Sequence, residues 1–362
     1  MKLIVLFVSL IIVSVALGEL IPTREEFLRW TKRHGKFYND EREIEAKFEV
    51  WVNNIAHVNK INNANMTWKA TIENKFGDLT PEEFKEMVLM KDYQRHPSSS
   101  HAVSNITRSG KSYDTESFDW RDYGAVTQVQ DQGSVGSCWA FSAIGSVEGQ
   151  WFLGHNELVN LSEEYLVDCD GESDETHADC GVFGGWPYLA YQFIMETGGV
   201  PTEETYPYCS GTGDCYPCML GPISLCGPPP MYCEKNITLA CPNAELYSNI
   251  RDWTDISTNE VEIAQQLVDI GPLSALLDAT QLQFYDSGIW TGKIDNTSPL
   301  LGCHTDTLDH AVLLVGYGTE NGVDYWSVKN SWGEKFGEEG YFRIVRGSGT
   351  CGINTAVTSA LR

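Results

Sequence analysis

The sequence is poor in positive charge. Its 362 residues include 25 lysines and arginines against 50 aspartates and glutamates, which gives a formal net charge of −25 at pH 7. Binding to nucleic acid depends on cationic side chains that meet the phosphates, so this balance argues against a nucleic-acid partner. It suits a soluble protein of an acidic compartment, where many carboxylates lose their charge.

Long hydrophobic runs are also scarce, and the one clear example lies at the N-terminus. Residues 3–17 are apolar, Lys2 precedes them, and the run ends in the small residues Ala16 and Gly18. This pattern is typical of a secretory signal peptide, residues 1–18, that is cut after Gly18. A membrane anchor is the alternative, but the run is short for crossing a bilayer. We expect a mature chain free of the membrane, in a lysosome-like or vacuole-like acidic compartment or outside the cell.

Cysteine is missing from the whole N-terminal third, since the first of the 11 cysteines is Cys138. Residues 23–34 and 41–62 have a helical pattern, and in the second stretch one face carries Ile44, Phe48, Trp51, Ile55 and Val58. A polar stretch at 96–114 has the composition of an exposed, cleavable linker. This order predicts a pro-segment over residues 19–113 and a mature enzyme over 114–362. A small helical domain is the alternative.

The rest of the chain is dotted with cysteines. Disulfides are the default in a secretory compartment, and an odd count leaves one cysteine either free or bonded to another chain. Residues 209–241 hold six cysteines and five prolines, which predicts an irregular loop stapled by disulfides. A zinc site on Cys215 and Cys218 is the less favoured alternative. The acidic stretch 170–179 is expected to be a solvated loop. Candidate glycosylation sites are Asn65, Asn105, Asn160, Asn236 and Asn296.

The mature part changes character along its length. Helices are expected over residues 138–154 and 161–169, and strands over 272–279, 310–318, 323–333 and 340–347. A helical first half followed by a strand-rich second half predicts an α+β fold with two lobes.

Cys138 stands apart from the other cysteines. Gly133 and Gly136 permit a tight turn, and the helix is expected to start at Cys138. The positive end of a helix favours the thiolate, which is the nucleophilic form of cysteine. Cys138 is therefore a candidate nucleophile, and half of a structural disulfide is the alternative.

His310 is the candidate base, because it opens a strand that a turn at residues 319–322 connects to the next strand. A hairpin there pairs positions whose numbers sum to about 640, which makes His310 and Asn330 cross-strand neighbours. The Asn330 side chain can then accept from one imidazole nitrogen and leave the other facing the thiol. A purely structural histidine is the alternative.

These residues carry a family resemblance. CWAFS at 138–142, DHAVLLVGYG at 309–318 and KNSWG at 329–333 resemble the papain family of cysteine proteases, of the cathepsin L-like type. The resemblance runs from about Thr23 to the C-terminus. It implies a papain-like two-lobe fold, with a helical lobe and a β-barrel-like lobe, preceded by a helical propeptide that blocks the cleft until it is removed.

The resemblance also implies roles for single residues. Cys138 would be the nucleophile, His310 the base and Asn330 the residue that orients the base. Gln132 would form the oxyanion hole together with the backbone N–H of Cys138, and Trp332 would shield the His–Asn contact from water.

Two propeptide motifs of the family match as well. The helix motif E-x3-R-x3-F-x2-N-x3-I-x3-N is met in register by Glu43, Lys47, Trp51, Asn54, Val58 and Asn62. The second motif is met by Asn74, Phe76 and Asp78, although Ile72 stands where the family has glycine. The chain's own propeptide is therefore its expected inhibitor.

Substrate contacts follow from the same resemblance. Backbone groups of Gly184 and Gly185 would bind the extended peptide. The pocket for the residue two before the cut would be walled by Trp186, Pro187, Leu276, Leu308 and Ala356. Since these side chains are apolar, we expect leucine, valine or phenylalanine at that substrate position and not arginine.

The sequence departs from the family in its cysteines. Val135 replaces the first cysteine of the usual C-G-S-C-W, so Cys180, which resembles its usual partner, needs another one. Cys303 with Cys351 and Cys169 with Cys215 resemble family pairs. Six cysteines then remain besides Cys138, and this even number supports a free thiol at Cys138.

Spacing and loop position bear on the kind of peptidase. Cys138 and His310 are 310 − 138 = 172 residues apart, more than the roughly 130–150 expected, and the stapled and acidic loops account for the excess. The stapled loop lies about where the family's carboxydipeptidase carries histidines that hold the substrate's terminal carboxylate. Residues 209–241 contain no histidine, which predicts an endopeptidase.

The prediction is therefore a cysteine endopeptidase made as a proenzyme. It would be a monomer that acts on protein or peptide substrates through a thioester, and no metal or organic cofactor is implied. The rival interpretations are a catalytically inactive binding or inhibitory protein of the same fold, and a chain in which Cys138 is structural and another thiol is free.

Overall fold

The computed structural model describes residues 22–90, 101–103, 106–114, 116–170, 179–211, 241–294 and 302–362. The predicted signal peptide and almost all of the stapled loop, including Cys215 and Cys218, lie outside these residues. Within the described ranges, no helix is both long enough and apolar enough to cross a membrane.

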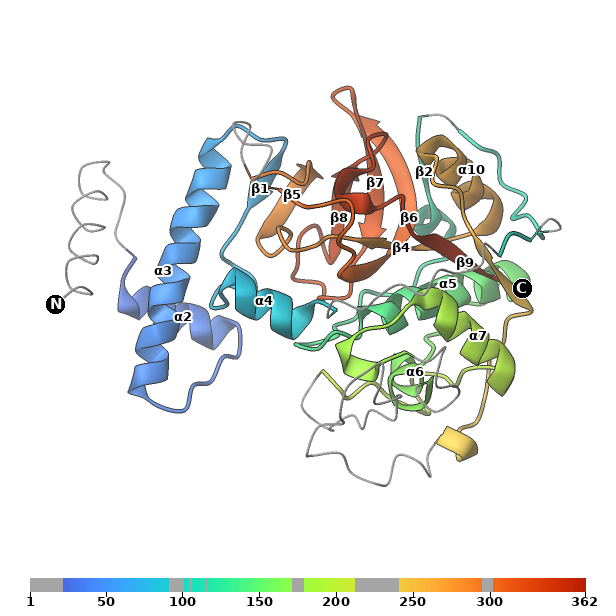
Figure 1. The fold of residues 1–362 in the computed structure, drawn as a ribbon, viewed down its shortest axis with the longest axis horizontal. Helices are drawn as coiled ribbons and strands as arrows, with labels where there is room; N and C mark the ends of the chain where they lie inside the picture. The colour runs from blue at the N-terminus through green and yellow to red at the C-terminus, as the bar shows by residue number, and fades with distance from the viewer. Residues whose placement is uncertain are drawn as a thin grey trace.

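The N-terminal module contains helices α2 (Arg24–Arg33), α3 (Glu41–Asn63) and α4 (Pro81–Val88) and the short strand β1 (Trp68–Ala70), coloured blue to cyan in Figure 1. The two predicted helices are confirmed, and each begins at a capping residue: Thr23 forms a capping box with Glu26, and Asp40 accepts from two backbone N–H groups. Phe27, Trp30, Phe48 and Trp51 form a small core of their own between α2 and α3.

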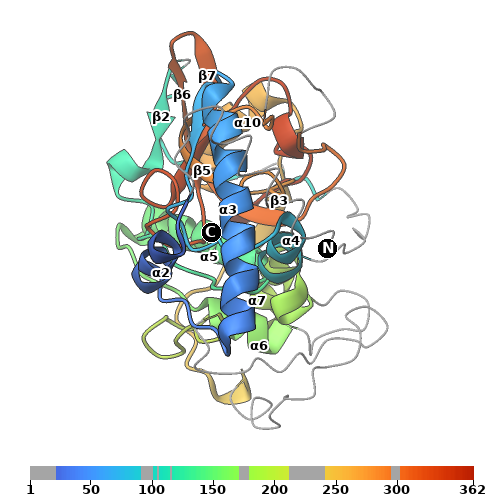
Figure 2. The same ribbon diagram turned by 90° about the vertical axis from the view of Figure 1, so that its left-hand side faces the viewer.

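A pair of β-strands joins this module to the rest of the chain. Strand β1 runs antiparallel to β5 (Tyr285–Trp290), and the Asn74 side chain donates to the Gln283 carbonyl at 2.9 Å. Figure 2 looks onto α3, which lies across this side of the protein. The second motif, around Phe76, is therefore buried at the junction between the module and the rest of the chain, with Phe76 1% exposed.

The helical lobe consists of α5 (Cys138–His155), α6 (Glu163–Cys169) and α7 (Pro187–Thr197), with 3-10 turns η3 (Gly181–Phe183) and η4 (Cys241–Asn243). Helix α5 is the central element, because residues 138–150 are buried all round. It packs directly against the sheet: the Ser142 hydroxyl donates to the Val312 carbonyl at 2.7 Å. A side chain at Gly145 would come within 2.8 Å of Leu313.

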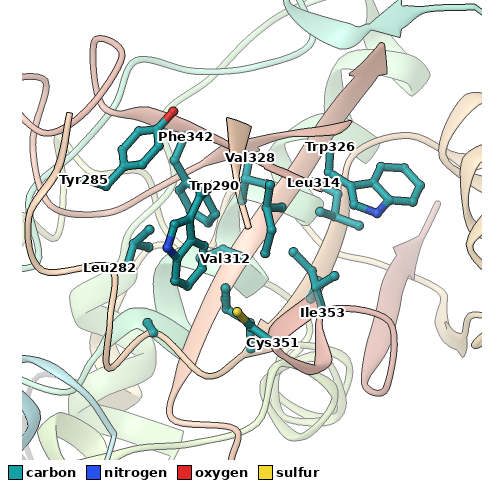
Figure 3. Packing of buried hydrophobic residues seen from close by; sticks show 14 of the residues in the cluster. Leu282, Tyr285, Trp290, Val312, Leu314, Trp326, Val328, Phe342, Cys351 and Ile353 are labelled. Atoms are coloured by element: carbon teal, nitrogen blue, oxygen red, sulfur yellow. The ribbon is translucent and has the colours of Figure 1, made fainter. Parts of the chain in front are cut away.

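The other lobe is a sheet with strand order β1-β5-β8-β7-β6-β4-β9-β3, and β2 pairs with β6. All pairs are antiparallel except β5–β8. Its core is rich in aromatic and branched side chains, including Trp290, Trp326 and Phe342 (Figure 3). The remaining bounds are η1 Trp120–Tyr123, β2 Phe118–Asp119, β3 Asp252–Asp255, α10 Glu260–Ile270, β4 Leu273–Leu277, β6 His310–Glu320, β7 Val323–Lys329, β8 Tyr341–Val345, η5 Thr350–Gly352 and β9 Val357–Leu361. The predicted two-lobe α+β fold is confirmed.

The β6–β7 hairpin has the turn that the sequence predicts. Asn321 and Gly322 have φ angles of 52° and 77°, and Glu320 pairs with Val323 across them. This two-residue turn suits the twist of the strands. The pairs nearest the turn sum to 643 and, beyond a register shift between Leu314 and Gly316, to 642, which is two to three more than the predicted sum of about 640.

The described parts of the predicted linker are partly exposed, yet hydrogen bonds hold them against the rest of the chain. The backbone N–H of His101 donates to Asp255 at 2.9 Å, and the N–H of Ser109 donates to the Asp269 carbonyl at 2.7 Å. The linker therefore follows the edge strand β3 and the end of α10.

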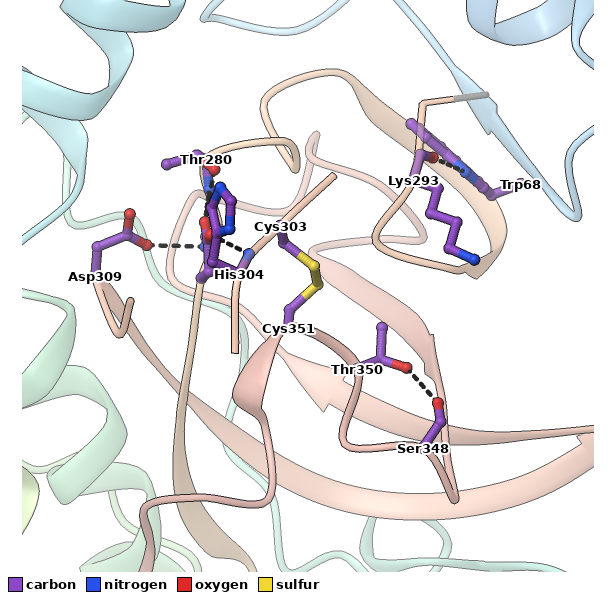
Figure 4. Close-up of a disulfide and its surroundings, with 11 residues drawn as sticks. Trp68, Thr280, Lys293, Cys303, His304, Asp309, Ser348, Thr350 and Cys351 are labelled. Atoms are coloured by element: carbon purple, nitrogen blue, oxygen red, sulfur yellow. Dashed lines mark hydrogen bonds between the residues drawn. A yellow bond between two sulfur atoms is a disulfide. The ribbon is translucent and has the colours of Figure 1, made fainter. Parts of the chain in front are cut away.

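The disulfides confirm one predicted pair and correct another. Cys303 bonds to Cys351, as expected (Figure 4). The prediction of Cys169 with Cys215 is wrong, because Cys169 bonds to Cys241, with their Cα atoms 5.7 Å apart. Helix α6 ends at Cys169 directly beside the turn η4, which begins at Cys241, and a count of cysteines along the sequence cannot show this proximity. Cys138 is the one free cysteine within the described ranges.

Candidate active site

The thiol of Cys138 lies at the junction of the two lobes. It belongs to the first residue of α5, is fully buried, and takes part in no disulfide. Its sulfur accepts a hydrogen bond from the backbone N–H of Ala311 on β6, with a donor–acceptor distance of 3.4 Å. The first residue of the helix is thus held against the residue that follows His310.

His310 and Asn330 meet as predicted. The imidazole Nε2 and the Asn330 Oδ1 are 2.8 Å apart, and the same oxygen accepts from the Ser331 N–H at 2.9 Å. The other ring nitrogen, Nδ1, is buried and has no hydrogen-bond partner among the described residues. The indole of Trp332 stacks on His310 with ring centroids 4.6 Å apart and is itself 2% exposed. One imidazole nitrogen is therefore oriented and the other is left available.

Gln132 precedes Cys138 on a tight loop. Its side-chain amide donates to the carbonyl oxygens of Val135, at 2.7 Å, and of Val88, at 3.0 Å. Its Oε1 accepts from the Ser331 hydroxyl at 2.5 Å. Val88 is the last residue of α4, so that the N-terminal module presents a backbone carbonyl to this amide.

Leu89 and Met90, which follow α4 in the N-terminal module, lie beside the residues that flank Cys138 and His310. The Met90 N–H donates to the Asp309 carbonyl at 2.8 Å, and a side chain at Gly136 would come within 3.0 Å of the Leu89 oxygen. Met90 is 2% exposed and packs in one cluster with Cys138 and the predicted pocket residues Trp186, Leu276, Leu308 and Ala356. Pro187 is the buried first residue of α7.

Residues 115–361 match the papain family cysteine protease domain. The chain belongs to the papain family. Residues 27–84 of this papain-family chain match the cathepsin propeptide inhibitor domain, which agrees with the position of the N-terminal module over the thiol. The protein is therefore a cysteine protease that carries its own propeptide as an inhibitor.

Relatives and solved structures support the same assignment over the full length. Cysteine proteinase 1 of Dictyostelium discoideum is 34% identical over 375 aligned residues that span 100% of both chains. Digestive cysteine proteinase 1 of Homarus americanus is 35% identical and covers 96% of this chain and 97% of its own. The structure of digestive procathepsin L 3 from the larval midgut of Tenebrio molitor has a TM-score of 0.72 at 32% identity and covers 94% and 99% of the two chains.

Burial shifts the pKa values of Cys138 and His310 in opposite directions. Loss of water raises the pKa of Cys138 to about 12, and the nearby Asp309 raises it too, against the hydrogen bond from Ala311. The same loss of water lowers the pKa of His310 to about 4, against the bond to Asn330. In this proenzyme, burial therefore favours the neutral thiol and the neutral imidazole.

The two predicted substrate-binding glycines, Gly184 and Gly185, have different surroundings. The φ of Gly184 is 138°, and a side chain there would lie 3.2 Å from Met90, so this glycine faces the propeptide. A side chain at Gly185 would overlap Trp139 and Asp179. Gly185 therefore packs closely against the body of the lobe.

The expectation of a solvated acidic loop is wrong for its ends. Asp170 and Asp179 are 1% and 0% exposed, and Asp179 accepts from the Trp186 N–H at 2.6 Å. Burial raises the pKa of both carboxyls, that of Asp170 to about 7. Asp179 thus supports the backbone at Trp186, a role that an acidic run does not reveal. Residues 171–178 lie outside the described residues.

Sequence reasoning missed three other residues of the site. Asp309 directly precedes His310, and burial raises the pKa of its carboxyl to about 7. Ser331 bonds to both Gln132 and Asn330. The Tyr208 hydroxyl reaches the loop before Cys138. Asp309 and Ser331 could have been found as chain neighbours of predicted residues, whereas nothing in the sequence marks Tyr208.

Proposed function

We propose that this proenzyme yields an endopeptidase in which Cys138 is the nucleophile, His310 the acid–base group and Asn330 the residue that orients it. The observation that carries the proposal is the position of the Cys138 thiol, which is the free cysteine among the described residues. Its sulfur is 3.4 Å from the N–H that follows His310, and Asn330 holds that histidine at 2.8 Å through the ring nitrogen on the other side.

The proposed reaction is acyl transfer. Once the propeptide has left and water enters, His310 Nδ1 takes the proton from the Cys138 sulfur, and the thiolate attacks the peptide carbonyl carbon. The imidazolium then gives its proton to the leaving amine, and a thioester remains. Water hydrolyses the thioester with His310 as the base, which restores the thiol.

The oxyanion formed in each step would be held by two N–H groups. These are the Nε2 of Gln132 and the backbone N–H of Cys138, each worth on the order of 3 kcal/mol. In the proenzyme, the Gln132 amide already donates a hydrogen bond to the carbonyl oxygen of Val88. This contact supports the assignment, because a donor that accommodates a carbonyl here can accommodate the charged oxygen of an intermediate. Trp332 would shield the bond between His310 and Asn330 from water.

The proposed specificity follows from the residues that are buried in one cluster with Met90. An apolar side chain of the propeptide is buried with Trp186, Leu276 and Ala356, so we propose leucine, valine or phenylalanine two residues before the cut. The backbone at Gly184 and Gly185 would bind the extended substrate. The lack of histidine in residues 209–241 is the argument for an endopeptidase.

We propose the processing and the cellular location of the chain from its sequence. Residues 1–18 would be removed as a signal peptide and 19–113 as the propeptide, leaving 114–362 as a monomeric enzyme of a lysosome-like or vacuole-like compartment or of the extracellular space. Of the candidate glycosylation sites, Asn65 and Asn160 are exposed, and Asn105, Asn236 and Asn296 lie outside the described residues.

Selective alkylation tests the proposal. The processed protein is treated with radioactive iodoacetate at mildly acid pH, the label is mapped, and peptidase activity is followed in parallel. We expect one label, on Cys138, with loss of activity at the same rate, and no label in Cys138→Ser. A label on another cysteine would favour a structural Cys138. A labelled Cys138 in a protein without peptidase activity would favour the inactive binding protein.

A further inference from the structure

The loop Gln132–Ser137 joins the proposed oxyanion donor to the nucleophile. Gln132 and Ser137 are both fully buried, although the loop between them is a turn that contains Gly133 in a left-handed conformation, with φ 72°. Val135 provides no sulfur with which the loop could be cross-linked. Some other contact must therefore keep the amide of Gln132 and the N–H of Cys138 in a fixed relation.

Tyr208 spans the two ends of this loop. Its hydroxyl donates to the Gln132 carbonyl at 2.8 Å and lies 2.8 Å from the Ser137 hydroxyl. Since the single phenolic proton goes to Gln132, the Ser137 hydroxyl is the donor in the second bond. The ring also packs edge-on against Phe141 in the first turn of α5, with centroids 4.9 Å apart.

Tyr208 is itself held firmly. Its N–H donates to Glu203 at 2.9 Å, and the Glu164 carboxylate accepts from the N–H groups of Cys209 and Ser210, both at 3.0 Å. The backbone after it also touches the loop, because a side chain on Gly211 would overlap the Gln132 carbonyl at 1.7 Å. The segment 208–211 is thus a rigid support beneath the loop.

We infer that Tyr208 is a positioning residue, which fixes the Gln132–Ser137 loop so that the Gln132 amide and the Cys138 N–H converge on one oxygen. This inference rests on the proposed function. Tyr208 acts through Gln132, which Ser331 holds from the strand lobe by two bonds of 2.8 and 2.5 Å. Burial also raises the pKa of Tyr208, so its hydroxyl keeps the proton that it donates.

The test compares Tyr208→Phe with Tyr206→Phe, both made in the full-length proenzyme and then processed. Tyr206 is a matched control, because it lies two residues away, is also partly buried, and donates its hydroxyl to Asp168 at 2.8 Å. Three quantities are measured: kcat and KM for a peptide substrate, the affinity for a peptide aldehyde, and the rate of Cys138 alkylation by iodoacetate. The aldehyde forms a tetrahedral adduct that needs the oxyanion hole, whereas alkylation forms no oxyanion.

For Tyr208→Phe we expect kcat to fall about 10- to 100-fold, because a small misplacement of a catalytic group has an effect of this size. KM and the alkylation rate should stay within about twofold, and aldehyde affinity should fall in parallel with kcat. Tyr206→Phe should match the wild type in all three quantities. An unchanged kcat in Tyr208→Phe overturns the inference. A common fall of kcat, aldehyde affinity and alkylation rate, with a lower Tm, also overturns it, since the role would then be structural.

A second variant decides the matter if Tyr208→Phe does not fold. Ser137→Ala removes only the second bond of the bridge, and we expect a loss of about three- to tenfold in kcat and in aldehyde affinity together. No loss in Ser137→Ala would overturn the inference. Failure of the proposed function looks different, because the processed wild type would then have no peptidase activity to compare.

Discussion

The side-chain amide of Gln132 donates to the carbonyl oxygen of Val88 at 3.0 Å. A residue of the propeptide thus presents a peptide carbonyl to a donor that we assign to the oxyanion hole. The neighbouring Met90 fills an apolar cluster in the way proposed for a substrate side chain. If the proposed site is correct, the propeptide inhibits by occupying positions that the reaction needs, and burial favours the neutral forms of Cys138 and His310.

Loss of the Gln132 amide should impair catalysis more than substrate binding. For Gln132→Ala in the processed enzyme we expect kcat to fall about 100- to 1,000-fold, with KM changed little, because the donor acts on charge that develops in the transition state. Steady-state kinetics on a peptide substrate checks this. Gln130→Ala, two residues earlier, is the control and should keep normal kinetics. Equal effects on kcat from both variants would contradict the role of Gln132.

Removal of the propeptide should switch the charge of the catalytic pair. A thiol whose pKa is raised to about 12 stays protonated below that pH, and an imidazole whose pKa is lowered to about 4 stays neutral above it. We therefore expect no thiolate absorbance from the proenzyme at pH 6 and its appearance upon processing, when water restores the charged forms. Cys138→Ser gives the baseline. A thiolate signal of equal size before and after processing would contradict the argument.

The sequence predicts best those structural features that depend on short segments alone. The helices that begin after the caps Thr23 and Asp40 and the turn at Asn321–Gly322 follow from local caps and turns. The hairpin also brings His310 to Asn330, although its register differs from the predicted sum by two to three residues. The resemblance to the papain family supplied Gln132 and Trp332, which spacing alone would not single out.

What the sequence could not predict are contacts between distant segments. Cys169 bonds to Cys241 across 72 residues, and among the many cysteines of the loop nothing in the pattern favours one partner over another. Tyr208 and Gln132, 76 residues apart, meet only through the packing of the helical lobe. The burial of Asp170 and Asp179 likewise depends on tertiary structure, because a run of acidic residues by itself indicates a solvated loop.

The side chain of Met90 should account for much of the shielding of Cys138. Met90→Ser removes an apolar side chain that is 2% exposed, which weakens the cover by about 2 kcal/mol. We expect alkylation of Cys138 in the unprocessed protein to become about 10- to 30-fold faster. Met87→Ser is the control, because Met87 is 42% exposed on the same segment. Equal rates in the two variants would show that the backbone of the propeptide, and not Met90, provides the cover.

An ion pair across the junction should delay activation. Lys75 of the propeptide pairs with Asp131, the residue before Gln132, and the lysine side chain is 25% exposed. Burial lowers the pKa of Lys75, and the neighbouring Asp131 opposes this shift. In Lys75→Met the Asp131 carboxylate loses this bond, and we expect processing at acid pH to become about three- to tenfold faster. Gel analysis of the time course measures it, with the exposed Lys32→Met as control. If Lys75→Met were processed no faster than Lys32→Met, the pair would not contribute to latency.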